Sequence, residues 1–123
     1  MRFIEKLDKA SARNNSLLCI GLDIDLGRLP SEYLNKDDPI FSFNRKIIEE
    51  TKELVCAYKP NIAFYEMYGV YGITALLKTI EFVQAQGLPV ILDAKRGDVG
   101  HSSTAYAKAI FEVYKADATT VNP

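Results

Sequence analysis

The chain has 123 residues, of which 48% are hydrophobic and 25% are charged, and these values are typical of a soluble globular protein. Its net charge of −1 and pI near 5.8 exclude the bulk electrostatic attraction by which a basic protein binds a nucleic acid duplex. No apolar stretch approaches the roughly 20 residues of a membrane-spanning helix, so neither nucleic acid nor membrane is expected as a partner.

The two cysteines, Cys19 and Cys56, lie in apolar runs and lack the C-x-x-C spacing of a metal or redox site. We therefore expect buried, reduced thiols, which are typical of a cytoplasmic protein. The charged opening segment, residues 1–10, is unlike a secretory signal peptide.

Helical and strand patterns alternate from the start of the chain. Apolar residues recur at helical spacing over residues 2–13, and residues 17–22 predict a short strand that is covered on both faces. A turn-rich loop over residues 24–39 precedes a helix at residues 41–54. A second short strand follows at residues 55–59 and ends at a proline.

The same alternation continues in the rest of the chain. Residues 72–86 predict a helix, with Gly87 as the residue that follows its end. Residues 89–95 predict a third strand, residues 104–115 another helix, and residues 116–121 a fourth strand.

Strands that alternate with helices of this length predict βαβ units and a parallel sheet. The phosphate-binding fingerprints of open doubly wound sheets, G-x-G-x-x-G and G-x-x-x-x-G-K-[ST], are absent from the sequence. A closed (β/α)8 barrel needs about 250 residues, so four βα units make half of one. We therefore predict an α/β fold in which residues 1–123 form the N-terminal half of a single (β/α)8 TIM barrel domain, with no internal domain boundary.

Charged residues stand at the ends of three predicted strands. Asp23 follows the first strand, Lys59 ends the second, and Asp93 and Lys95 end the third. In a barrel these ends meet at one face, where active sites are built. Asp93 and Lys95 should share a strand face, whereas Arg96 should point the opposite way and form a structural ion pair. Each charge alone fits a solvated loop, but opposite charges on an inward face are costly without a function.

The run Asp93-Ala94-Lys95-Arg96-Gly97-Asp98 resembles the D-x-K-x-x-D signature of orotidine 5′-phosphate decarboxylases, in the form of the branch with longer bacterial chains. Supporting matches lie in the same order at residues 19–23, 58–65 and 120–123, so the resemblance covers the whole chain. It implies that the enzyme decarboxylates orotidine 5′-monophosphate to uridine 5′-monophosphate in de novo pyrimidine biosynthesis. It also implies that no metal or organic cofactor takes part.

The resemblance implies a role for each matching residue. Lys95 would stabilise and protonate the carbanion at C6, and Asp93 would lie against the substrate carboxylate while keeping Lys95 charged and oriented. Lys59 would hold the charges in place and contact the ribose. Asp23 would accept hydrogen bonds from the ribose hydroxyl groups.

The resemblance also implies a homodimer with shared active sites. Asp98 would be a catalytic residue that reaches from the loop after the third strand into the partner subunit's site. Ser102 stands where the family usually has threonine, and its hydroxyl would bind substrate in the partner's site. His101 replaces a common serine and is expected to be a surface residue of that loop. The phosphate-binding groups of the family belong to the C-terminal half of the barrel.

Three alternatives stay open at this point. The first is another barrel enzyme with the D-x-K-x-x-D signature, such as a sugar-phosphate decarboxylase or a magnesium-dependent hexulose-phosphate synthase, whose acidic residues bind Mg²⁺. The second is a fragment that is inactive without its C-terminal half. The third, a Schiff-base aldolase that uses Lys95 or Lys59, is disfavoured because a nearby aspartate keeps the amine protonated.

Overall fold

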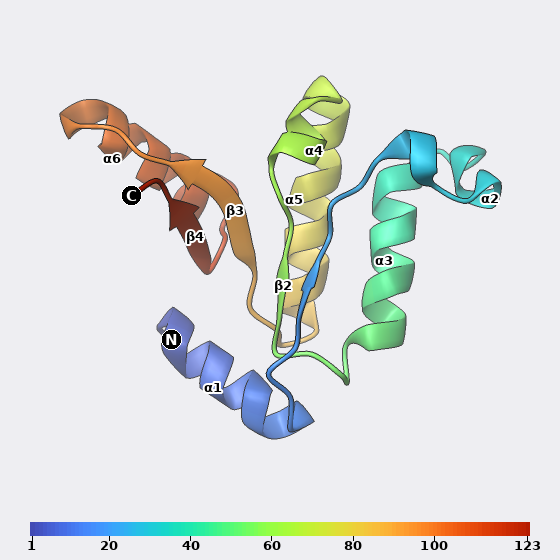
Figure 1. Ribbon diagram of the computed structural model, residues 1–123, viewed down its shortest axis with the longest axis horizontal. Helices are drawn as coiled ribbons and strands as arrows, with labels where there is room; N and C mark the ends of the chain where they lie inside the picture. Colours follow the sequence, from blue (N-terminus) through green and yellow to red (C-terminus); the bar gives the residue numbers. More distant parts are fainter.

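Four parallel strands alternate with helices in the computed structural model, which describes all 123 residues (Figure 1). The strands are β1 (Cys19–Gly21), β2 (Ala57–Lys59), β3 (Ile91–Arg96) and β4 (Ala118–Val121). Pairing joins β1 to β2 and β3 to β4, and two isolated bridges, Tyr58 with Val90 and Asn61 with Asp93, join β2 to β3. The strands therefore lie side by side in chain order, as consecutive units of a (β/α)8 barrel do.

The helices cover one side of these strands and their amino ends. The long helices are α1 (Phe3–Asn14), α3 (Pro39–Thr51), α5 (Gly69–Ala85) and α6 (Gly100–Lys108), which continues into a π-helical turn, η2 (Ala109–Val113). The short ones are the 3₁₀ turn η1 (Leu26–Arg28) and the helices α2 (Ser31–Leu34) and α4 (Ala63–Glu66). In Figure 1, α3 and α5 lie on the same side of β1 and β2, and α1 lies across the amino ends of the strands.

The strands and the long helices agree with the sequence patterns, whereas the short helices were not predicted. All four predicted strands and the four long helices are confirmed, with shifted ends, and Gly87 follows α5 with the expected positive φ of 75°. The predicted loop over residues 24–39 is wrong in part, because it contains η1 and α2. His101 lies in the first turn of α6 and not in a loop, because α6 begins at Gly100.

The core lies between the strands and the helices α3 and α5. Its largest fully buried apolar side chains lie in α3, α4 and α5, in β2 and β3, and just before these two strands: Ile40, Ile48, Val55, Tyr58, Tyr65, Leu76, Ile80, Val83, Val90 and Leu92. Burial of a large apolar side chain contributes roughly 1.5–3 kcal/mol. This packing holds the strands in register, so it also fixes the positions of the strand ends.

The two edge strands, β1 and β4, each lack a neighbouring strand on one side, and residues beside them are exposed. Leu17, just before β1, is 89% exposed, Val121 at the end of β4 is 68% exposed, and Cys19 is exposed, whereas Cys56 is buried. The predictions that both thiols are buried and that residues 17–22 are covered on both faces are therefore wrong for Cys19 and for the start of that strand. The physical reason is that β1 has only one neighbouring strand. No helix of this chain is long and apolar enough to cross a membrane.

Candidate active site

Asp93 lies between two lysine ammonium groups at the C-terminal ends of β2 and β3. Nζ of Lys59 is 3.0 Å from Oδ2 of Asp93, and Nζ of Lys95 is 2.7 Å from Oδ1. The Asp93 side chain is only 9% exposed, whereas the Lys95 side chain is 60% exposed. We call Lys59, Asp93 and Lys95 the charge array. Its carboxylate is buried, and the ammonium group of Lys95 is open to a ligand above the strand ends.

Hydrogen bonds between opposite charges favour the ionised forms of Asp93 and Lys59. Hydrogen bonds from Lys95, Thr120 and Lys59 hold the pKa of Asp93 far below its usual range, although burial acts in the opposite direction. The pKa of Lys59 is raised, mainly by its hydrogen bond to Asp93. An ammonium group held in this way is a poor nucleophile, and it is well suited to stabilise negative charge and to donate a proton.

Asp23 is held beside β2 by the segment that precedes α4. Its Oδ1 accepts the backbone N–H of Asn61 at 3.1 Å, and its charge contributes to the raised pKa of Lys59. The hydroxyl of Tyr65 in α4 donates to the carbonyl of Leu22 at 2.6 Å, directly before Asp23. The structure thus brings Asp23 close to the charge array, as the strand-end pattern predicted.

The strand β3 is irregular at the array. Leu92 pairs with Thr119 and Arg96 pairs with Val121, so β3 advances by four residues while β4 advances by two. Such a register shift is a bulge. Lys95 lies in it with a φ of 50°, in the left-handed region that residues with side chains rarely adopt.

Thr120 of β4 is the residue of this site that the sequence patterns missed. Its Oγ1 donates to Oδ1 of Asp93 at 2.7 Å and accepts the backbone N–H of Lys95 at 3.0 Å. A pattern of charged residues at strand ends does not include Thr120, because its side chain is neutral. The available signal was its place at the end of the fourth strand, within the matched segment at residues 120–123.

Arg96 lies on the other side of β3 from Lys95, as predicted. It forms an ion pair with Glu66 of α4 at 2.7 Å, and its guanidinium group lies 5.3 Å from the centre of the Tyr106 ring. This is the expected ion pair between elements of the fold. Because α4 also holds the end of β1 through Tyr65, this short helix connects the ends of β1 and β3.

Asp98 and Ser102 do not join the charge array within this chain. Asp98 lies in the predicted loop between β3 and α6, and its Oδ1 accepts the backbone N–H of Val99 at 2.8 Å. With Arg96 it lines a separate hollow of about 310 Å³ between β4 and α6. Ser102 is exposed in the first turn of α6, and its side chain makes no hydrogen bond. Both residues are therefore exposed on the surface of the chain, away from its own charge array.

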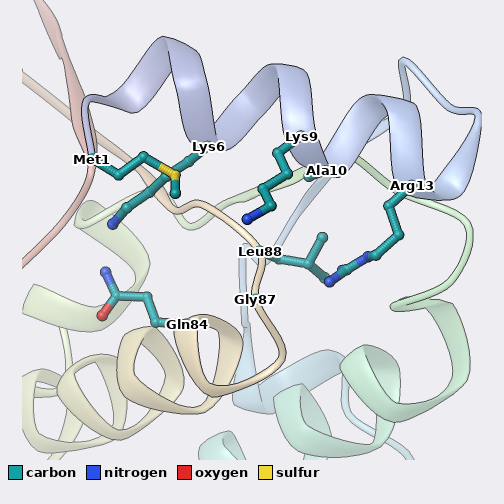
Figure 2. Close-up of a pocket in the computed structure, with 8 residues that line it drawn as sticks. All are labelled: Met1, Lys6, Lys9, Ala10, Arg13, Gln84, Gly87 and Leu88. Carbon is teal, nitrogen blue, oxygen red and sulfur yellow. The ribbon is translucent and has the colours of Figure 1, made fainter.

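A larger cavity, of about 430 Å³, lies at the opposite end of the strands (Figure 2). It is lined by the N-terminal Met1, by residues of α1 and by the segment around the end of α5: Met1, Lys6, Lys9, Ala10, Arg13, Gln84, Gly87 and Leu88. Two of its cationic side chains already have partners: Lys6 forms an ion pair with Asp117, and Arg13 donates a hydrogen bond to the carbonyl of Gln86. In (β/α)8 barrels this end serves stability. We therefore place the candidate active site at the charge array.

Residues 16–123 match the model of the family described as Orotidine 5'-phosphate decarboxylase / HUMPS family. The chain belongs to this family. It is 53% identical over its whole length to an orotidine 5'-phosphate decarboxylase of Thermomicrobium roseum, and 50% identical over 121 residues to one of Christiangramia forsetii. It spans 43% and 44% of these two family members, which is less than half of their length.

Solved structures of the family agree with the fold. A crystal structure from Toxoplasma gondii, provisionally assigned as an orotidine-monophosphate-decarboxylase, matches with a TM-score of 0.88 and 40% identity. The match covers 98% of this chain and 40% of that one. The predicted half-barrel is therefore confirmed, since this family member is more than twice as long as the segment that the chain supplies.

Proposed function

We propose that residues 1–123 are the N-terminal half of one barrel domain, and that the complete enzyme decarboxylates orotidine 5′-monophosphate to uridine 5′-monophosphate in pyrimidine biosynthesis. The charge array is the observation that carries this proposal. Loss of CO₂ leaves an electron pair on C6 that the pyrimidine ring delocalises poorly. A fixed ammonium group next to C6 stabilises that charge as it develops.

In the proposed reaction, Lys95 is the catalytic acid. The bond between C6 and the carboxylate breaks, CO₂ leaves, and the electron pair stays on C6. The ammonium group of Lys95 then donates a proton to C6 and is reprotonated from water. Asp93, 2.7 Å from that ammonium group, supplies its counter-charge and orients it. The 60% exposure of the Lys95 side chain supports access for a substrate.

The remaining residues of the array region are suited to bind a ribose. Asp23 has Oδ1 fixed by a backbone N–H, and its Oδ2 makes no hydrogen bond and can accept one from a hydroxyl group. Lys59 donates a hydrogen bond to Asp93, and the negative charge of Asp23 also acts on it. Its ammonium group can donate a further hydrogen bond to a ribose oxygen. We assign the phosphate-binding groups to the part of the barrel outside residues 1–123.

We further infer that the enzyme is a cytoplasmic homodimer in which Asp98 and Ser102 serve the partner subunit's site. Asp98 and Ser102 are exposed and make no bond to the charge array of their own chain, which supports a role in trans. The free thiols of Cys19 and Cys56 support a reducing compartment.

The magnesium-dependent alternative fits this donor set less well. Both oxygens of Asp93 already accept hydrogen bonds from ammonium groups, so a Mg²⁺ ion bound there would have to displace a lysine. No three His, Cys, Asp or Glu side chains lie together as a set of ligands. Turnover of orotidine 5′-monophosphate that survives EDTA would exclude the magnesium-dependent reaction.

The proposal is tested by Lys95→Ala in the full-length protein. We expect turnover of orotidine 5′-monophosphate to fall by at least about a thousand-fold, because the variant loses both charge stabilisation and the proton donor. Binding of uridine 5′-monophosphate should persist, because the phosphate contacts lie elsewhere. Lys9→Ala, which removes an exposed lysine of α1 at the opposite end, is the control and should keep normal turnover. Near-normal turnover by Lys95→Ala would overturn the assignment.

The same variant tests the shared site. Lys95→Ala and Asp98→Ala subunits are each expected to be inactive alone. If each site combines Lys95 of one subunit with Asp98 of the other, a mixed dimer has one intact site. Random mixing should then restore about a quarter of wild-type turnover. No recovery in dimers shown to have mixed would place both residues in the same subunit's site.

A further inference from the structure

We propose that Thr120 is a positioning residue of the charge array, whose hydroxyl fixes both the Asp93 carboxylate and the backbone of Lys95. The inference rests on the proposed decarboxylase function of the same site and adds a residue to it. Thr120 makes no hydrogen bond to Lys59 or to the ammonium group of Lys95, so its effect on the reaction is indirect.

The hydroxyl of Thr120 is both a hydrogen-bond donor and a hydrogen-bond acceptor. It donates its hydrogen to Oδ1 of Asp93 at 2.7 Å, and a lone pair accepts the backbone N–H of Lys95 at 3.0 Å. A hydroxyl can make both bonds at once, whereas an aliphatic side chain of the same shape can make neither. One side chain therefore links the carboxylate of the array to the backbone that carries its exposed lysine.

The bulge in β3 is the reason that this link is needed. Where β3 advances by four residues against two of β4, the regular ladder between the two strands is interrupted. The Lys95 N–H bonds to a β4 side chain, not to a β4 carbonyl. Lys95 also has a φ of 50°, a conformation that persists only where the surroundings hold it. Thr120 supplies the bond that holds the backbone of Lys95 in this conformation.

The link also determines where the ammonium group of Lys95 lies. Oδ1 of Asp93 is shared by Lys95 and Thr120, while Oδ2 is bound to Lys59. Without the hydroxyl, the carboxylate loses one of its three donors and the Lys95 backbone loses its partner. A displacement of about 1 Å at a reacting group can reduce turnover by about a hundred-fold. Substrate binding depends on other contacts and should change little.

Thr119 provides a matched control on the same strand. Its Oγ1 donates to the backbone carbonyl of Leu92 at 2.9 Å, and it makes no bond to the charge array. Thr119 and Thr120 are both half-buried. Valine at either position removes one hydroxyl from β4 and keeps the shape of the side chain, but only Thr120→Val removes a bond to the array.

The experiment compares Thr120→Val, Thr120→Ser and Thr119→Val in the full-length protein. We expect Thr120→Val to lower kcat by about ten- to a hundred-fold, as the loss of hydrogen bonds to charged groups does. KM and the affinity for uridine 5′-monophosphate should stay within about three-fold. Thr120→Ser should restore most of kcat because it restores the hydroxyl, and Thr119→Val should keep it.

Hydrogen exchange of the Lys95 amide provides a readout that does not depend on turnover. The amide should exchange at least about ten-fold faster in Thr120→Val, because its acceptor is gone, and should be unchanged in Thr119→Val. If Thr120→Val does not fold, Thr120→Ala takes its place in the same comparison.

Three results would overturn the inference: normal kcat in a folded Thr120→Val protein, an equal loss of kcat in Thr119→Val, or no recovery in Thr120→Ser. Absence of decarboxylation by the wild-type protein would instead count against the proposed function. In that case the exchange measurement would still test the link between Thr120 and Lys95.

Discussion

Asp93 accepts hydrogen bonds from three side chains, and two of these donors are cations. Its carboxylate lies between the ammonium groups of Lys59 and Lys95, so each lysine depends on it for a counter-charge. Removing one partner of a buried ion pair generally costs more than the pair itself contributes, because the other charge is left without compensation. Here removal of Asp93 would leave two cations facing each other.

The pKa shifts of this array predict how stability changes with pH. Asp93 has a lowered pKa in the folded protein, so its contribution is complete above its unfolded pKa of about 4 and is lost as the pH falls further. The raised pKa of Lys59 has the opposite sign, and its contribution is lost only above about pH 10.5. We therefore expect Asp93→Asn to lower the stability of the full-length protein by about 2 kcal/mol between pH 5 and 9. The difference should shrink below about pH 4.

Thermal unfolding of wild type and Asp93→Asn across this pH range measures that difference. Asp37→Asn is a suitable control, because Asp37 is exposed and its side chain makes no hydrogen bond or ion pair. Its small effect should not vary with pH. A stability difference for Asp93→Asn that stays constant down to pH 2 would contradict the prediction, since it would mean that ionisation of Asp93 is irrelevant to stability.

Among the elements of the fold, the sequence predicted the long helices and the strands, and it missed the short helices and the bulge in β3. The long helices carry a period that is visible over several turns, and the strands lie in continuous apolar runs, whereas α2 and α4 have four residues each, too few to show a period. The strand-end rule correctly placed Asp23, Lys59 and Asp93 together. The role of Thr120 depends on the register between β3 and β4, which no local pattern contains, and no glycine in β3 signals its bulge.

The contact between α4 and α5 predicts an unusual response to a small substitution. A Cβ on Gly72 of α5 would lie 1.9 Å from the carbonyl oxygen of Tyr65 in α4. Helix propensity alone favours alanine over glycine by about 1 kcal/mol. Because the clash is with backbone, we expect Gly72→Ala to destabilise the full-length protein by about 2 kcal/mol or more. It should also raise KM, since Tyr65 holds the end of β1 beside Asp23.

Thermal unfolding and steady-state kinetics test this prediction together. Thr74→Ala is the control on the same helix, because Thr74 is exposed and its hydroxyl bonds only to the carbonyl of Val70. Its effect should stay within about 0.5 kcal/mol, as is usual for surface positions. A Gly72→Ala protein more stable than wild type would show that α4 can move away from α5 at little cost.

The chain as a whole is packed on one side and open at both edges. Its core is built against α3 and α5, while β1 and β4 each lack a neighbouring strand on one side. Large apolar side chains remain exposed, among them Leu17 at 89%, Val70 at 85% and Val99 at 83%. Unpaired strand edges and exposed apolar groups favour association with other chains. The charge array therefore lies in a segment whose two edge strands are unpaired on one side.

This arrangement predicts the behaviour of residues 1–123 expressed alone. We expect association into oligomers or aggregates and no measurable decarboxylation, because the open edges pair with other copies and the proposed phosphate contacts are missing. Co-expression with the remaining segment of the full-length protein should restore turnover by covering β1 and β4. A Lys95→Ala version of the same pair should assemble equally well and stay inactive, which separates assembly from catalysis. Sedimentation and turnover measure both properties, and a monomeric, active 123-residue chain would show that the charge array and the edges of the half-barrel need no second half.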